Sequence, residues 1–139
     1  MSFDIFLQCF RNGQPAPISL ELFESIFLPH DTHPEAYEDD PGYLTLEYPD
    51  GGGGVLHCDG IATRGGMMFN HCGGKSFWDD IYRLADRTGS VIYWPSPGPH
   101  GVVTREEVLK ELPQDGFDLS VIKVVRNSEE IGEAIQNSP

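Results

Sequence analysis

The stretch SFDIFLQCF, residues 2–10, decides the fold because its apolar residues recur with a period of two. Successive side chains of a β-strand point to opposite faces of a sheet, so this period predicts a strand. One face carries Phe3, Ile5, Leu7 and Cys9. The other face also carries aromatic side chains, at Phe6 and Phe10. With apolar residues on both faces, we predict that this strand lies in the centre of a sheet.

The remaining elements alternate irregularly around this strand. Period-two patterns predict strands over 43–48, 55–58, 67–71, 90–94 and 121–125. Helices are expected to begin at the capping residues Ser19, Ser76, Thr104 and Ser128. We expect a surface loop over 30–41 and a rigid proline-rich loop over 95–101. The order predicts one α+β domain over 1–139, with a mixed or antiparallel sheet of about five to six strands and three to four helices.

The charge balance restricts the partners of the chain. The 139 residues include 22 acidic and 9 basic residues, a net charge of −13. Nucleic acids and anionic membranes are bound through Lys and Arg, so we expect neither as a partner. No apolar run approaches the roughly 20 residues of a membrane span. The start of the chain lacks a basic leader region, and the cysteine count is odd, at three. We therefore expect a cytoplasmic protein with free thiols.

The acidic segment 30–41 is the best candidate for a binding surface. Its carboxylates and its tyrosine can meet Lys and Arg side chains on a basic protein. The predicted partner-binding residues are Asp31, Glu35, Tyr37, Glu38, Asp39 and Asp40. The glycine-rich hairpin tip 51–54 is a second contact candidate. The competing interpretation is a solvated acidic loop with no partner.

Two His-Cys pairs, His57-Cys58 and His71-Cys72, stand fourteen residues apart. Adjacent residues of a strand face opposite sides of a sheet, so neither pair can readily chelate one ion. Cys72 precedes a predicted helix, with two glycines between, and is the best candidate for a nucleophilic thiol. The segment 73–76 also matches the end of a phosphate-binding loop, but its first glycine is absent. We expect no metal and no cofactor.

The opening MSFDIFLQCF resembles the start of a group of small, mostly uncharacterised bacterial proteins. The segments 68–71, 77–81 and 91–95 are similar as well. This resemblance implies no activity. In size and acidity the chain is similar to immunity proteins, which neutralise a cognate toxin. Our leading interpretation is a non-enzymatic protein that binds a basic partner, such as a toxin domain. The alternative is a small metal-dependent or thiol-dependent hydrolase centred on His57, His71 and Cys72.

Overall fold

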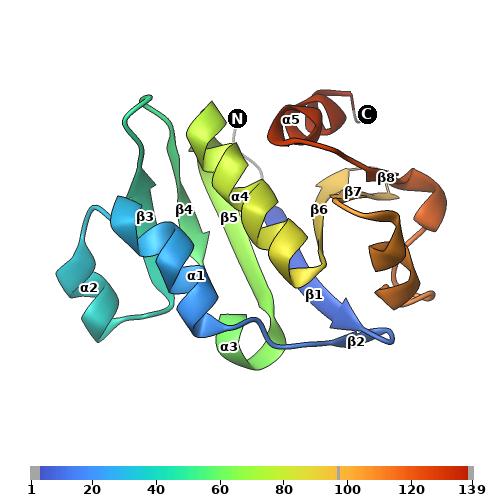
Figure 1. Cartoon of the computed structure of the whole chain (residues 1–139), viewed down its shortest axis with the longest axis horizontal. Helices are drawn as coiled ribbons and strands as arrows, with labels where there is room; N and C mark the ends of the chain where they lie inside the picture. The colour runs from blue at the N-terminus through green and yellow to red at the C-terminus, as the bar shows by residue number, and fades with distance from the viewer. Residues whose placement is uncertain (1–3, 97, 138–139) are drawn as a thin grey trace.

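A mixed sheet forms the centre of the computed structural model, which describes residues 4–96 and 98–137 (Figure 1). Within these residues the sheet has eight strands in the order β3-β4-β5-β1-β6-β7-β8, and β2 pairs with β1. All pairs are antiparallel except β7 with β8. The strands are β1 (Ile5–Arg11), β2 (Gln14–Pro15), β3 (Tyr43–Glu47), β4 (Gly53–His57), β5 (Gly66–Gly73), β6 (Ser90–Ser96), β7 (Gly98–Val103) and β8 (Ile122–Val124).

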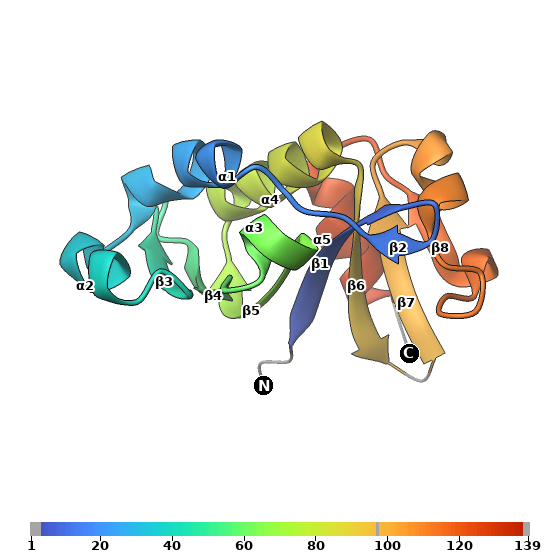
Figure 2. The ribbon, with the colours of Figure 1, turned by 90° about the horizontal axis from the view of Figure 1, so that it is seen from below.

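Helices α1 and α4 lie side by side across one face of the sheet (Figures 1 and 2). The α-helices of the described residues are α1 (Leu20–Phe27), α2 (Pro34–Asp39), α3 (Ile61–Arg64), α4 (Lys75–Thr88) and α5 (Ser128–Gln136). The described residues also form three 3₁₀-helices: η1 (Leu28–His30), η2 (Glu106–Glu111) and η3 (Leu119–Val121). The predicted α+β class with one mixed sheet is confirmed, but strands and helices are more numerous than predicted. No helix among the described residues has the length and apolar character of a membrane span.

Strand β1 occupies the centre of the sheet, between β5 and β6, as its sequence predicts. Ile5, Leu7 and Cys9 are buried under the α1–α4 layer, in the larger of two apolar cores. A smaller core on the opposite face, around Val91 and Val103, packs against η2. The predicted strand residues Ser2 and Phe3 lie outside the described residues.

The described residues of the proline-rich segment, 95–96 and 98–101, do not form a loop, because they belong to the paired strands β6 and β7. Residue 97 of the predicted loop lies outside the described residues. Pro95 is opposite Pro99 in the register of that hairpin. The pairing of β6 with β1 ends at Tyr93, and the pairing of β7 with β8 begins at Gly101. Both prolines therefore lie where their strand has only one neighbour, a position that tolerates a residue without an N–H. The predicted loop is wrong for that reason.

Only the first of the predicted helix caps is confirmed. The Ser19 side chain accepts a hydrogen bond from the Leu22 N–H at the start of α1. Helix α4 begins after Gly74, and no side chain of its own segment caps it. Helix α5 is capped by Asn127, whereas Ser128 donates to Asp79 of α4. Neighbouring elements recruit the expected capping hydroxyls for other contacts.

The Thr104 cap is also wrong, because its hydroxyl donates to Asp86 of α4. The segment that follows forms the 3₁₀-helix η2 after Arg105, without a side-chain cap. The predicted loop over 30–41 is wrong in part, since it contains α2. Pro34 occupies the first helical position of α2, where its missing N–H has no intrahelical partner to lose.

Candidate functional site

One end of the molecule carries negative charge without basic residues. We call residues 20–59 the acidic lobe; it contains α1, α2, β3 and β4 and appears in blue to green in Figure 1. This segment holds ten carboxylates and no Lys or Arg: Glu21, Glu24, Asp31, Glu35, Glu38, Asp39, Asp40, Glu47, Asp50 and Asp59. The rest of the chain has all nine basic residues and the other twelve acidic ones. The net charge of −13 is therefore concentrated at this end.

Helix α2 holds the predicted binding residues at the outer side of the acidic lobe. Glu35, Glu38, Asp39 and Asp40 are exposed, as a docking surface requires. Whether a partner binds there stays a prediction.

The other two predicted binding residues serve the fold. Tyr37 is only 8% exposed, and its hydroxyl donates to Glu24 of α1 at 2.9 Å. Burial and this carboxylate raise the pKa of Tyr37, so the phenol stays protonated and anchors α2. Asp31 is partly buried and accepts from the His33 N–H at 3.0 Å. Tyr37 is thus mostly buried within the fold, and its role in binding a partner stays a prediction.

The carboxylates of the acidic lobe have no cationic partner in the described part of the chain. The ion pairs there use Asp79, Asp80, Asp86 and Glu107, all outside the lobe. Paired charges cancel at a distance, whereas unpaired charges of one sign add to a field that reaches roughly 8–10 Å at physiological salt. The lobe therefore has an uncompensated negative field.

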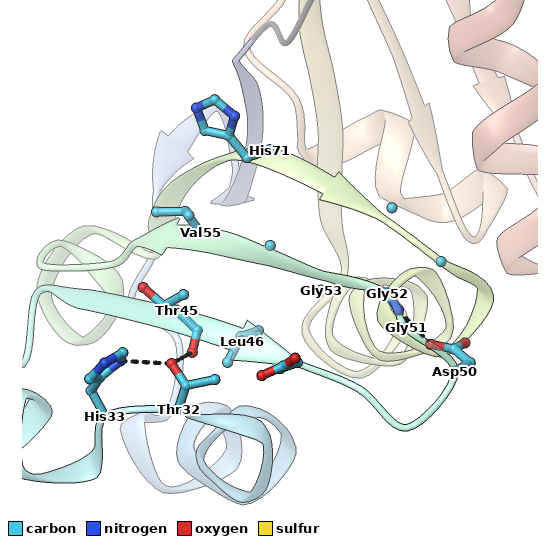
Figure 3. A pocket seen from close by; sticks show the side chains of 14 residues that line it. Thr32, His33, Thr45, Leu46, Asp50, Gly51, Gly52, Gly53, Val55 and His71 are labelled. Carbon is cyan, nitrogen blue, oxygen red and sulfur yellow. Dashed lines mark hydrogen bonds between the residues drawn. The ribbon is translucent and has the colours of Figure 1, made fainter.

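An open hollow of about 770 Å³ lies between the glycine-rich hairpin tip and the ends of β3 and β5 (Figure 3). His33 and His71 lie on opposite sides of it, with β4 between them. His33 is bound to the Thr32 hydroxyl at 2.7 Å, and Thr32 also donates to the Thr45 carbonyl. The polar groups bind each other and do not converge on one point, so this hollow lacks the arrangement of an active site.

Asp50, next to the hairpin tip, occupies the site where segment 73–76 resembles the end of a phosphate-binding loop. The Asp50 carboxylate accepts from the Gly52 N–H at 2.9 Å and from the Ser76 N–H of α4 at 3.0 Å. These hydrogen bonds lower the pKa of Asp50. A carboxylate therefore occupies the start of α4, where an anionic ligand would bind. Glycine is required at Gly74, because a Cβ there would lie 2.6 Å from the Gly52 Cα.

The two His-Cys pairs do not assemble into one site. His57 is opposite Met68 in the β4–β5 register, and the centroid of its ring lies 5.2 Å from that of the Tyr43 ring. His71 lies three residues farther along β5, roughly 10 Å at the usual rise per residue. Cys72 packs against the larger core on the other face. The described residues contain no group of three or more His, Cys, Asp or Glu side chains that could hold a metal ion.

Both thiols of these pairs are held in the protonated form. Burial, followed by the charge of Asp59, raises the pKa of Cys58 to about 12. Burial raises the pKa of Cys72 to about 11. A nucleophilic cysteine needs the opposite shift, toward the thiolate at neutral pH. The geometry therefore does not support the predicted alternative of a hydrolase built on His57, His71 and Cys72.

A buried ionic cluster that the sequence does not indicate joins the acidic lobe to α4. Asp80 is 6% exposed and accepts from the Tyr48 hydroxyl at 2.7 Å and from Arg83. His30 stacks on Tyr48 at 4.0 Å between ring centroids. The three partners come from η1, the end of β3 and α4, so only the tertiary structure brings them together. The cluster fixes the lobe to the helical layer.

Comparisons of the chain with protein-family models, with curated proteins and with solved structures found no significant match.

Proposed function

We propose that this protein binds a basic protein through its acidic lobe, most concretely as an immunity-type inhibitor of a basic bacterial toxin domain. One observation carries the proposal: ten carboxylates lie in one segment of the chain that has no Lys or Arg, and none of them forms an ion pair with a described residue. Complementary charge steers association and can raise its rate by about 10 to 1,000 times. The three free cysteines fit a reducing compartment, the cytoplasm in this proposal.

Such a charge distribution is costly for stability, which favours a binding role for it. Like charges repel one another, and the compact state brings them closer together than the unfolded chain does. Four carboxylates of α2 and its end, namely Glu35, Glu38, Asp39 and Asp40, are exposed. The first three make no hydrogen bond or ion pair with any described residue. Their arrangement therefore adds little to the fold and much to the external field.

A charge-reversal experiment tests the proposal. The protein and a Glu35→Lys/Glu38→Lys/Asp39→Lys variant are immobilised, and basic proteins are captured from the source cells at low salt. Association rates of the captured protein are then measured over a range of salt concentrations. We expect the variant to bind at least about tenfold more slowly and to lose most of the salt dependence.

The matched control is Glu106→Lys/Asp115→Lys/Glu133→Lys. These three carboxylates are also exposed but lie outside the acidic lobe. The control changes the net charge by the same amount, so its association rate should fall much less. Equal effects of the two variants would show that only total charge matters, and the acidic lobe would lose its role.

The immunity function needs a separate readout. The captured protein, or its basic domain, is expressed in a heterologous host with and without this chain. Restored growth on co-expression supports inhibition of a toxin. Growth arrest that the chain does not relieve, despite tight binding, would leave a binding protein that is not an inhibitor.

A further inference from the structure

The face of the sheet opposite α1 and α4 mixes apolar and polar side chains where it is not covered by the smaller core. On β1, β4 and β5 it carries the apolar Phe6, Val55 and Met68 beside the polar Gln8, His57 and Asn70, all of them partly exposed. Antiparallel sheets with one solvated face usually carry polar residues on that face. Contiguous apolar surface that stays exposed is typical of an interaction site. The partly exposed apolar residues Phe6, Val55 and Met68 are the feature of this face that an interaction site would use.

A hollow of about 360 Å³ is formed on this face; we call it the β1–β5 hollow. Phe6 and Met68 line it, and Tyr93 stacks on Phe6 with 5.2 Å between ring centroids. Gln8 closes one end together with Arg64, because the Gln8 amide donates to the Arg64 carbonyl at 2.6 Å. The volume lies near the lower end of the range of about 300–1,000 Å³ for ligand pockets, enough for one large side chain.

The β1–β5 hollow is continuous with the acidic lobe. Asp59 lines the hollow directly after β4 and is exposed. Gly42 lies against it, since a Cβ on Gly42 would be 2.9 Å from the Asp59 Cβ. The Gly42 N–H donates to Asp40, at the end of α2, at 3.2 Å. A protein that docks on the α2 carboxylates can therefore reach the hollow without leaving the surface of the lobe.

We infer that the β1–β5 hollow receives a large apolar side chain that the basic partner carries among its Lys and Arg residues. This inference rests on the proposed function and adds the apolar anchor to it. Interfaces derive most of their affinity from a few aromatic or aliphatic anchors in pockets, surrounded by a polar rim. Here Phe6, Met68 and Tyr93 form the apolar part of the pocket. The charged residues that line it are Asp59 and Arg64, so the selection for basic residues around the anchor comes from the carboxylates beyond Asp59, which continue through Asp40 to α2.

Two short peptides of equal charge test the inference without knowledge of the partner. KRWKR and KRGKR, both acetylated and amidated, are titrated into ¹⁵N-labelled protein at low salt. We expect KRWKR to bind at least about tenfold more tightly, because only its indole can fill the hollow. We expect both peptides to shift the amide signals of α2, and only KRWKR to shift those of His57 and Met68.

A filling variant adds a second measurement. Met68→Trp places an indole in the hollow, whereas Val55→Trp places one on the same face beside the other hollow and is the matched control. We expect Met68→Trp to remove the tenfold preference for KRWKR and Val55→Trp to retain it. The signal pattern of each variant confirms that it is folded.

The outcomes separate the inference from the proposed function. If both peptides bind equally while α2 signals shift, the anchor is refuted and the acidic docking surface stands. A preference that persists in Met68→Trp also refutes the anchor, since the indole then binds elsewhere. If neither peptide shifts the α2 signals, the acidic lobe does not attract basic segments, and the inference falls with the proposed function.

Discussion

Removal of one hydroxyl, in Tyr48→Phe, should cost a large part of the stability of the fold. Tyr48 is 4% exposed, and its hydroxyl donates to the buried Asp80 carboxylate at 2.7 Å. Burial and this hydrogen bond raise the pKa of Tyr48, so the phenol is protonated and donates throughout the neutral range. A hydrogen bond to a charged group contributes about 1.5–3 kcal/mol, and both groups here are shielded from water. Phenylalanine keeps the ring contacts but leaves that carboxylate oxygen with His30 alone, at 3.6 Å.

This loss converts into a measurable shift of the melting temperature. The unfolding entropy of about 2.1 cal/mol/K per residue gives about 0.3 kcal/mol/K for 139 residues. A loss of 1.5–3 kcal/mol therefore lowers Tm by about 5–10 °C. Thermal and urea unfolding, both followed by circular dichroism, measure the effect at pH 7. The matched control is Tyr43→Phe, because Tyr43 is 44% exposed; it should change the free energy of unfolding by less than about 0.5 kcal/mol.

The same substitution made in an Asp80→Asn variant tests whether the charge of Asp80 causes this loss of stability. In Asp80→Asn the acceptor is neutral, so Tyr48→Phe should cost only about 0.5–1.5 kcal/mol there. A cost in the wild-type background no larger than that of Tyr43→Phe would show that the phenol does not stabilise the Asp80 carboxylate. An equal cost in both backgrounds would assign the effect to loss of the hydroxyl and not to the charge of its acceptor.

Three further predictions concern the elements around the acidic lobe. Asp50→Asn should destabilise the protein at pH 7 and have little effect near pH 2. Because the pKa of Asp50 is lowered in the fold, the carboxylate stabilises the protein above the unfolded-state pKa, and this stabilisation is lost as the pH falls. Urea unfolding at a series of pH values measures the effect. Native Cys72, with a pKa of about 11, should react with iodoacetamide at pH 8 about 100 times more slowly than an unfolded cysteine; comparable rates would refute its burial. Tyr37→Phe should increase amide hydrogen exchange in α2, because the bond to Glu24 is lost; unchanged exchange would show that α2 is held otherwise.

The main features of the fold could be predicted because they depend on local periodicity. The alternation in residues 5–9 predicts a central strand, and the apolar spacing after Ser19 predicts α1, with its cap. The hairpin of β3 and β4 follows from two apolar strands around a glycine turn. These signals lie within about ten residues of chain, the range over which strand and helix patterns act.

The errors arise where distant segments compete for the same groups. Ser76 and Ser128 are good capping residues in sequence, yet Asp50 accepts from the first and Asp79 from the second. Pro95 and Pro99 are read as parts of a loop, although they face each other in the β6–β7 pair, where neither strand has a second neighbour. No local pattern contains the position of the partner element, so these contacts could not be predicted.

The sequence by itself determined the α+β class and the excess of negative charge, since both depend only on composition and on short-range pattern. Only the tertiary structure decided where that charge gathers and which residues face it. It buried Tyr37, separated His57 from His71, and placed Asp59 beside the apolar β1–β5 hollow. The physical reason is that a side chain's neighbours across a sheet come from strands far apart in the chain, and these neighbours decide its exposure and its charge.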